Sequence, residues 1–148
     1  MISFDTNILV YATGAQPLEK AQRARDLITR GLRSANTVFL LQTLGEFSHV
    51  ALRKQGMPVS AVLPLVEAWQ GLVPVHAAEP ADLLPALHAV REHGLSFWDA
   101  LLWASARRIR VSHLLTEDLQ DGRTFEGVRF VNPFVRANDS LISRLLPL

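Results

Sequence analysis

The stretch Ile2-Ser3-Phe4-Asp5-Thr6-Asn7-Ile8-Leu9-Val10 is the one from which the fold and the site can be worked out. An apolar strand over residues 1–4 runs directly into a carboxylate and a carboxamide, and a second apolar run over residues 8–12 follows. Ligands of open α/β sheets bind at the carboxyl ends of the strands, so Asp5 is predicted to be the centre of an acidic site. The structural alternative is that Asp5 only caps a short helix over residues 6–12.

Composition indicates a compact globular chain without a general affinity for polyanions. The 148 residues fit one domain, residues 1–148, and are 49% hydrophobic and 20% charged with a net charge of +1. All but two of the fifteen basic residues are Arg. Arg suits bidentate contacts with phosphate, although an Arg-rich genome would produce the same bias.

The sequence contains no Cys, which excludes disulfides and thiolate metal sites and fits a reducing compartment. The first residues already have the pattern of a strand and not of a signal peptide. No apolar run approaches the ~20 residues that a membrane helix needs. The expectation is a cytoplasmic protein without a membrane partner.

Short apolar strands alternate with helices along the whole chain. Strands are predicted at residues 1–4, 37–41, 73–75, 113–116 and 128–131, and helices at 6–12, 19–33, 42–55, 60–71, 82–93 and 98–109. Pro64 fits its helix only if it falls in the first turn, and the residues after 134 have the pattern of a polar tail. This order predicts an α/β fold, with a short central parallel sheet of about four to five strands flanked by helices on both faces.

A second acid, Asp99, begins the helix after Ser96. Ser96 and Asp99 have the spacing of a capping box, which is the structural interpretation of Asp99. The first two turns of that helix are apolar on every side, so the helix is predicted to be buried. A buried carboxylate is unfavourable unless it is paired or bound to a metal.

A third group of acids follows the strand at residues 113–116. Asp118 comes soon after this strand, as Asp5 comes after the first strand, so the two would be neighbours if their strands are adjacent. Asp121 precedes Gly122, which is also a turn signal by itself. Glu46 lies in the helix after the second strand, where the plain interpretation is a solvated residue on a polar face.

The chain resembles the PIN-domain ribonucleases, specifically the VapC-type toxins of toxin–antitoxin pairs. The segments that carry the resemblance, in order, are FDTNILVYA, LGEFSHVAL with Glu46, LSFWDALLWASA, LLTEDLQDG and VNPF. The resemblance implies a catalytic quartet of Asp5, Glu46, Asp99 and Asp118. It implies that Asn7 and Thr116 hydrogen-bond these carboxylates, that Asp121 is an additional acid, and that Glu117 lies outside the site.

Several carboxylates packed together raise one another's pKa unless a cation neutralises them. Oxygen ligands without Cys or a His pair favour Mg²⁺ or Mn²⁺, with Asp5, Asp99 and Asp118 as direct ligands. No Ser–His or Cys–His nucleophile is evident, so the ion would activate water for hydrolysis of an RNA phosphodiester, with Glu46 as ligand or water-positioning base.

The resemblance implies an RNA substrate, a homodimer and an inhibitory antitoxin. Arg107, Arg108 and Arg110 are the predicted RNA contacts, with Arg23, Arg30 and Arg33 as a second set. The apolar helix segment 62–69 is a candidate surface for one of the protein partners.

Two alternative functions remain. In a phosphotransfer or phosphatase domain Asp5 would accept the phosphoryl group, but Asn7 stands where such enzymes need a second acid. A non-catalytic interaction module of the same fold would not need the intact set of acids.

Overall fold

The computed structural model describes residues 1–14 and 16–148 and confirms the predicted α/β fold with a mostly parallel sheet. One sheet has the strand order β1-β4-β6-β5, formed by Ile2–Phe4, His113–Leu115, Val128–Val131 and Thr124–Phe125. The pairs β1–β4 and β4–β6 are parallel, whereas β5 is antiparallel to β6. The parallel pair β2 (Phe39–Leu40) and β3 (Val75–His76) continues this sheet through a bridge between Ile2 and Thr37.

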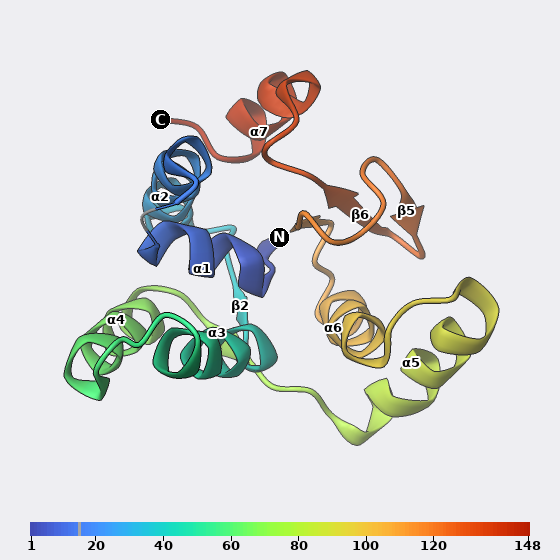
Figure 1. The fold of residues 1–148 in the computed structure, drawn as a ribbon. Helices are drawn as coiled ribbons and strands as arrows, with labels where there is room; N and C mark the ends of the chain where they lie inside the picture. Colours follow the sequence, from blue (N-terminus) through green and yellow to red (C-terminus); the bar gives the residue numbers. More distant parts are fainter. Residues whose placement is uncertain (15) are drawn as a thin grey trace.

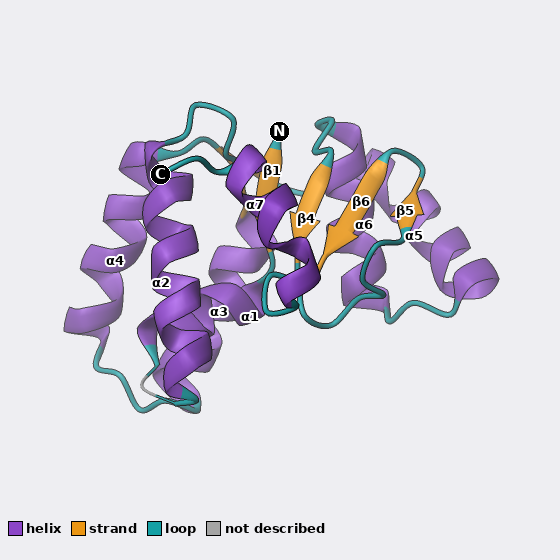
Figure 2. Cartoon of the chain, turned by 90° about the horizontal axis from the view of Figure 1, so that it is seen from above, coloured by secondary structure: helices purple, strands orange, loops and turns teal. Residues whose placement is uncertain are grey.

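Seven α-helices are found in the described residues. They are α1 (Thr6–Thr13), α2 (Leu18–Arg33), α3 (Leu41–Arg53), α4 (Val59–Leu72), α5 (Pro80–His93), α6 (Phe97–Arg108) and α7 (Asp139–Leu145). Figure 1 shows α2 and α7 on one side of the sheet and α5 and α6 on the other. The strands β1, β4, β6 and β5 lie next to one another in Figure 2.

Two hydrophobic clusters fill the space between helices and sheet. One joins β1 to helices α1 to α4 and α7, and the other joins β4 and β6 to α5 and α6. Helix α2 approaches β1 closely at Gly31, where an added Cβ atom would lie 2.6 Å from Cε2 of Phe4. Glycine is therefore needed at this position for α2 to pack on β1.

The structure corrects three expectations. The strand β5 was not predicted, and the supposed polar tail contains α7, which buries Ile142. Pro64 is not in the first turn, because α4 already begins at Val59 after Pro58. Its missing N–H leaves the carbonyl of Ser60 without a helical partner, but Pro64 and Ser60 are both exposed, so water can satisfy that carbonyl.

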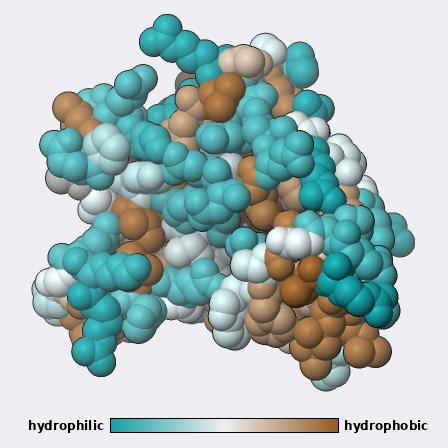
Figure 3. All heavy atoms as spheres, turned by 45° about the vertical axis from the view of Figure 1, so that its right-hand side comes forward, coloured by the Kyte–Doolittle hydropathy of each residue, from teal (hydrophilic) through white to brown (hydrophobic). Residues whose placement is uncertain are grey.

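The segment 62–69 contributes mainly to the core, because Val62 and Trp69 are buried while Leu63 is exposed. A more exposed hydrophobic surface lies on α5, from Leu83, Leu84 and Leu87. Figure 3 shows hydrophobic surface over this part of the molecule at the lower right. No helix of residues 1–14 and 16–148 is both long enough and apolar enough to cross a bilayer.

Candidate functional site

Asp5 is a buried carboxylate at the junction of β1 and α1. Its backbone N–H donates to Leu115 O on the adjacent strand β4 (2.9 Å), and its side chain, which is 5% exposed, caps α1 by accepting from Thr6 N (2.6 Å). The other carboxylate oxygen accepts from Thr116 Oγ1 (2.7 Å). Burial raises the pKa of Asp5 to about 6, against the two hydrogen bonds and with a further contribution from Asp118 and Asp99.

Asp118 lies next to Asp5 because β1 and β4 are adjacent and parallel. Its Oδ2 accepts from Asn7 Nδ2 (3.0 Å), and its backbone N–H donates to Thr116 Oγ1 (3.1 Å). The hydroxyl of Thr116 therefore links Asp5 to the loop that carries Asp118. The hydrogen bonds expected of Asn7 and Thr116 are both present.

Glu46 projects from α3 toward the same edge and is held at both oxygens. Its Oε1 accepts from Gln42 Nε2 (2.8 Å), one helical turn earlier, and its Oε2 accepts from Thr6 Oγ1 (3.0 Å). Gln42 Nε2 also donates to Trp98 O (2.9 Å), so the same amide connects α3 to the start of α6. Glu46 is therefore a fixed, half-buried side chain and not a freely solvated one.

Asp99 lies in the first turn of α6, where its backbone N–H donates to the cap Ser96 Oγ (3.2 Å). Burial raises the pKa of Asp99. A side-chain hydrogen bond of the Asp99 carboxyl group with Ser96 opposes this shift, while the charges of Asp118 and Glu46 reinforce it. The contacts of Thr6 with Glu46 and of Gln42 with both Glu46 and Trp98 O bring the segments that carry Asp5, Glu46 and Asp99 together, beside Asp118.

The four acids have no cationic partner within residues 1–14 and 16–148. Among the described residues, no Lys, Arg or His forms an ion pair with Asp5, Glu46, Asp99 or Asp118. Carboxylates gathered without a paired cation form a region of negative potential suited to a hard cation.

The donor set fits a divalent cation in its chemistry. Beside the carboxylates, the amide oxygens Asn7 Oδ1 and Gln42 Oε1 are buried and have no hydrogen-bond partner among the described residues. A buried amide oxygen without a donor is unfavourable, and a cation or its bound water would satisfy it. As they stand, however, no three acids or histidines within residues 1–14 and 16–148 form a group that could hold an ion.

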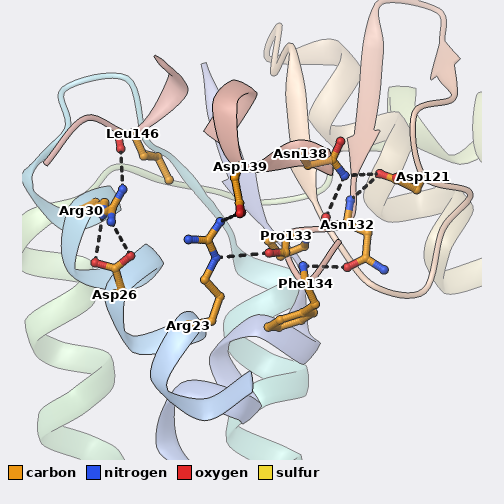
Figure 4. A network of polar contacts seen from close by, with 10 residues as sticks. All are labelled: Arg23, Asp26, Arg30, Asp121, Asn132, Pro133, Phe134, Asn138, Asp139 and Leu146. Atoms are coloured by element: carbon orange, nitrogen blue, oxygen red, sulfur yellow. Dashed lines mark hydrogen bonds and ion pairs between the residues drawn. The ribbon is translucent and has the colours of Figure 1, made fainter. Parts of the chain in front are cut away.

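Asp121 and Glu117 point to other partners. Asp121 Oδ1 accepts from Asn132 N (2.8 Å) and Asn138 Nδ2 (2.9 Å), so it anchors the segment after β6, as Figure 4 shows. Glu117 forms an ion pair with Lys20 of α2.

The predicted RNA contacts lie at the far end of α6. Asp99 is in the first turn of this helix and Arg107 in the last, about 12 Å along the helix axis at 1.5 Å per residue. Arg107 forms an ion pair with Glu126, and Arg108 donates to Asp82 Oδ1 and Glu79 Oε1, both at 2.9 Å. Two of the three guanidinium groups are thus already paired with acids.

Two residues of the site were not predicted. Gln42 stands four residues before Glu46, so helical spacing could have indicated their contact. The contact of Thr6 with Glu46 depends on how α1 packs against α3, and nothing in the local sequence signals it.

Solved structures with the same fold are PIN-domain toxins of the VapC and FitB kinds. A toxin–antitoxin complex from Klebsiella pneumoniae matches with a TM-score of 0.67 and 19% identity, over 90% of this chain and 98% of the other. The structure of FitAB bound to the IR36 DNA fragment matches with a TM-score of 0.66 and 20% identity, over 91% of this chain and 96% of the other. Mycobacterium tuberculosis VapC20 is a toxin that cleaves the sarcin–ricin loop. It matches with a TM-score of 0.64 and 18% identity, over 80% of this chain and 92% of the other.

A scan against protein-family models finds no match to the sequence, and a search of curated proteins finds no significant match. The structural matches span most of this chain and establish the PIN-domain fold.

Proposed function

We propose that this protein is a metal-dependent endoribonuclease and the toxin of a toxin–antitoxin pair. The observation that supports this most strongly is the gathering of Asp5, Glu46, Asp99 and Asp118 without a cation from the described part of the chain. The fold is consistent with the proposal, since the structurally similar toxin VapC20 cleaves the sarcin–ricin loop. We propose Mg²⁺ or Mn²⁺ as the cofactor, with Asp5, Asp99 and Asp118 as ligands.

The protein residues would hold and orient the reacting groups. The hydroxyl of Thr116 and the N–H of Thr6 hold Asp5, and Asn7 holds Asp118. Each of these hydrogen bonds uses one lone pair of a carboxylate oxygen, so other lone pairs remain for an ion. No three acids of residues 1–14 and 16–148 form a coordinating group, so small side-chain rotations around the anchored Asp5 and Asp118 would have to bring the carboxylates together.

When bound, the ion would supply a Lewis acid for the phosphodiester and its attacking water. Glu46, held by Gln42 and Thr6, would be a further ligand or would position that water. We place Asp121 at the margin of the site, where it anchors the segment that follows β6.

The partners are part of the same proposal. We propose an RNA substrate, a cognate antitoxin and a homodimer, in the cytoplasm. One of the similar structures is a toxin–antitoxin complex. The exposed leucines of α5 are a candidate contact for one of these proteins.

Phosphoryl transfer through Asp5 is less well supported by the contacts. Both oxygens of Asp5 accept hydrogen bonds, and the side chain is only 5% exposed. A phosphoryl acceptor needs an accessible, nucleophilic oxygen.

The test is cleavage of RNA by the purified protein with Mg²⁺, with Mn²⁺ and with EDTA. We expect cleavage with either ion, none with EDTA, and a loss in Asp5→Asn that exceeds the roughly 10- to 100-fold loss typical of residues outside the ligand shell. Glu67→Gln, a change of an exposed acid on α4, is the matched control and should cleave as the wild type does. Metal-dependent cleavage that survives Asp5→Asn would refute the proposed site.

A further inference from the structure

A cavity of about 420 Å³ lies between the beginning of α2 and the segment that follows β6. Its lining combines three basic and two acidic side chains with a polar amide and an apolar pair. The lining residues are Glu19, Lys20, Gln22, Arg23, Pro133, Phe134, Arg136 and Asp139. The lining thus carries a surplus of positive charge, in contrast to the nearby acidic site.

Lys20 connects this cavity to the candidate catalytic site. It pairs with Glu117, which stands between Thr116 and Asp118 in the chain. Its Nζ atom lies 5.0 Å from the ring centroid of Tyr11 and 5.1 Å from that of Phe134. An ion pair and two cation–π contacts hold this ammonium group at the border between the cavity and the acids.

Arg23 lies one helical turn after Lys20 on the same face of α2. Its Nε donates to Pro133 O (3.3 Å), and its guanidinium pairs with Asp139 (2.7 Å), as Figure 4 shows. Arg136 is exposed and forms no ion pair within the described residues. The cavity therefore offers one fixed ammonium and one fixed guanidinium group, with a second guanidinium that remains free to bind an anion.

We infer that this cavity binds a phosphodiester group of the RNA chain beside the scissile bond, an inference that rests on the proposed nuclease function. Lys20, Arg23 and Arg136 supply the positive charge, and Phe134 supplies an apolar surface for a sugar or base. RNA is the favoured occupant because its phosphates repeat along the strand, so a strand crossing the acidic site carries a further phosphate toward Lys20. Arg136, which unlike Arg107 and Arg108 forms no ion pair within the described residues, is the main phosphate contact, with the paired Lys20 and Arg23 beside it.

The test changes the charge of the lining without removing a contact. The side chain of Gln22 is exposed and makes no hydrogen bond within the described residues, so Gln22→Glu and Gln22→Lys should both fold. We expect Gln22→Glu to weaken, and Gln22→Lys to strengthen, binding of a fluorescent single-stranded RNA oligonucleotide in EDTA. Arg136→Ala should weaken binding roughly three- to tenfold and reduce the slope of log K against log salt by about 0.7.

Arg129→Ala changes an exposed side chain on β6 that forms no ion pair within the described residues, so it is the control and should leave affinity and salt slope unchanged. Arg110→Ala tests the competing RNA contact at the far end of α6. Unchanged RNA binding in the Gln22 and Arg136 variants would overturn the inference, as would a larger effect of Arg110→Ala. If the wild type cleaves RNA but the cavity variants bind it normally, only the cavity assignment fails. If the wild type neither binds nor cleaves RNA, the proposed function fails with it.

Discussion

Two buried aspartates in this molecule have opposite environments. Asp82 at the start of α5 is 2% exposed, and Asp5 after β1 is 5% exposed. Asp82 accepts from Arg108 Nε (2.9 Å), Ser105 Oγ (3.1 Å) and the backbone N–H of Glu79 (2.8 Å). Burial alone would raise the pKa of Asp82, but these partners outweigh it and lower the pKa.

Asp5 has hydrogen bonds but forms no ion pair with a basic residue in the described part of the chain, and its acidic neighbours add to the effect of burial. Its pKa is therefore raised to about 6, in the opposite direction from that of Asp82. A carboxylate compensated by Arg108 ties α5 to α6 and serves the fold. A carboxylate left uncompensated beside three other acids is unfavourable for the protein alone and becomes favourable once a cation binds.

Each aspartate accepts a hydrogen bond from one neighbouring hydroxyl group, and removing that hydroxyl should show which of the two aspartates serves catalysis. Thr116→Val removes the donor to Asp5 and the acceptor of Asp118 N, so we expect RNA cleavage to fall about 10- to 100-fold. Ser105→Ala removes the corresponding donor to Asp82 and should leave cleavage unchanged while lowering the free energy of unfolding by about 1 kcal/mol. Equal losses of cleavage in the two variants would contradict the assignment of Asp5 to catalysis and of Asp82 to the fold.

The amide variants should change stability in opposite directions at pH 7 without metal. Asp82→Asn deprives Arg108 of a charged partner, and we expect it to lower the free energy of unfolding by about 2 kcal/mol. Asp5→Asn removes a buried, repelled charge and should raise the free energy of unfolding by about 1–2 kcal/mol. Urea denaturation of the metal-free proteins measures both, and a destabilising Asp5→Asn would contradict the account.

The pH dependence should follow from the same pKa shifts. Asp5 has a pKa of about 6 when folded and 3.8 as its ordinary value, so its contribution to stability is fully present below 3.8 and is lost as the pH rises through 6. The gain in unfolding free energy of Asp5→Asn over the wild type should therefore grow between pH 4 and 6 and level off above pH 7. The pKa of Asp82 is shifted in the opposite direction. The loss of unfolding free energy in Asp82→Asn should therefore shrink as the pH falls below the ordinary aspartate range.

Much of the fold could be predicted from the sequence because its signals are local. The strand over residues 128–131 has the predicted limits, and the boundaries of α2, α3 and α5 lie within about two residues of the expected ones. The helix α7 could not be predicted in the same way. It is short, and its burial of Ile142 depends on contact with distant parts of the chain.

Some residues of the candidate site could also be predicted from the sequence, and others could not. Asp5 and Asp118 could be paired from the sequence because each follows a strand, and the adjacency of β1 and β4 confirms that they are neighbours. The interpretation of Glu46 as part of this region depended on the family resemblance, since its own helix gives only a polar face. Partners such as Lys20 for Glu117 are set by tertiary packing across 97 positions and leave no local signal.

The central claim is that the uncompensated carboxylates around Asp5 form a cation site. Binding of Mn²⁺ at pH 7 without RNA, followed by calorimetry, tests it most directly. We expect the wild type and Asp82→Asn to bind Mn²⁺ and Asp5→Asn to lose that binding. Equal Mn²⁺ binding by Asp5→Asn and the wild type, or no binding by the wild type, would contradict the claim.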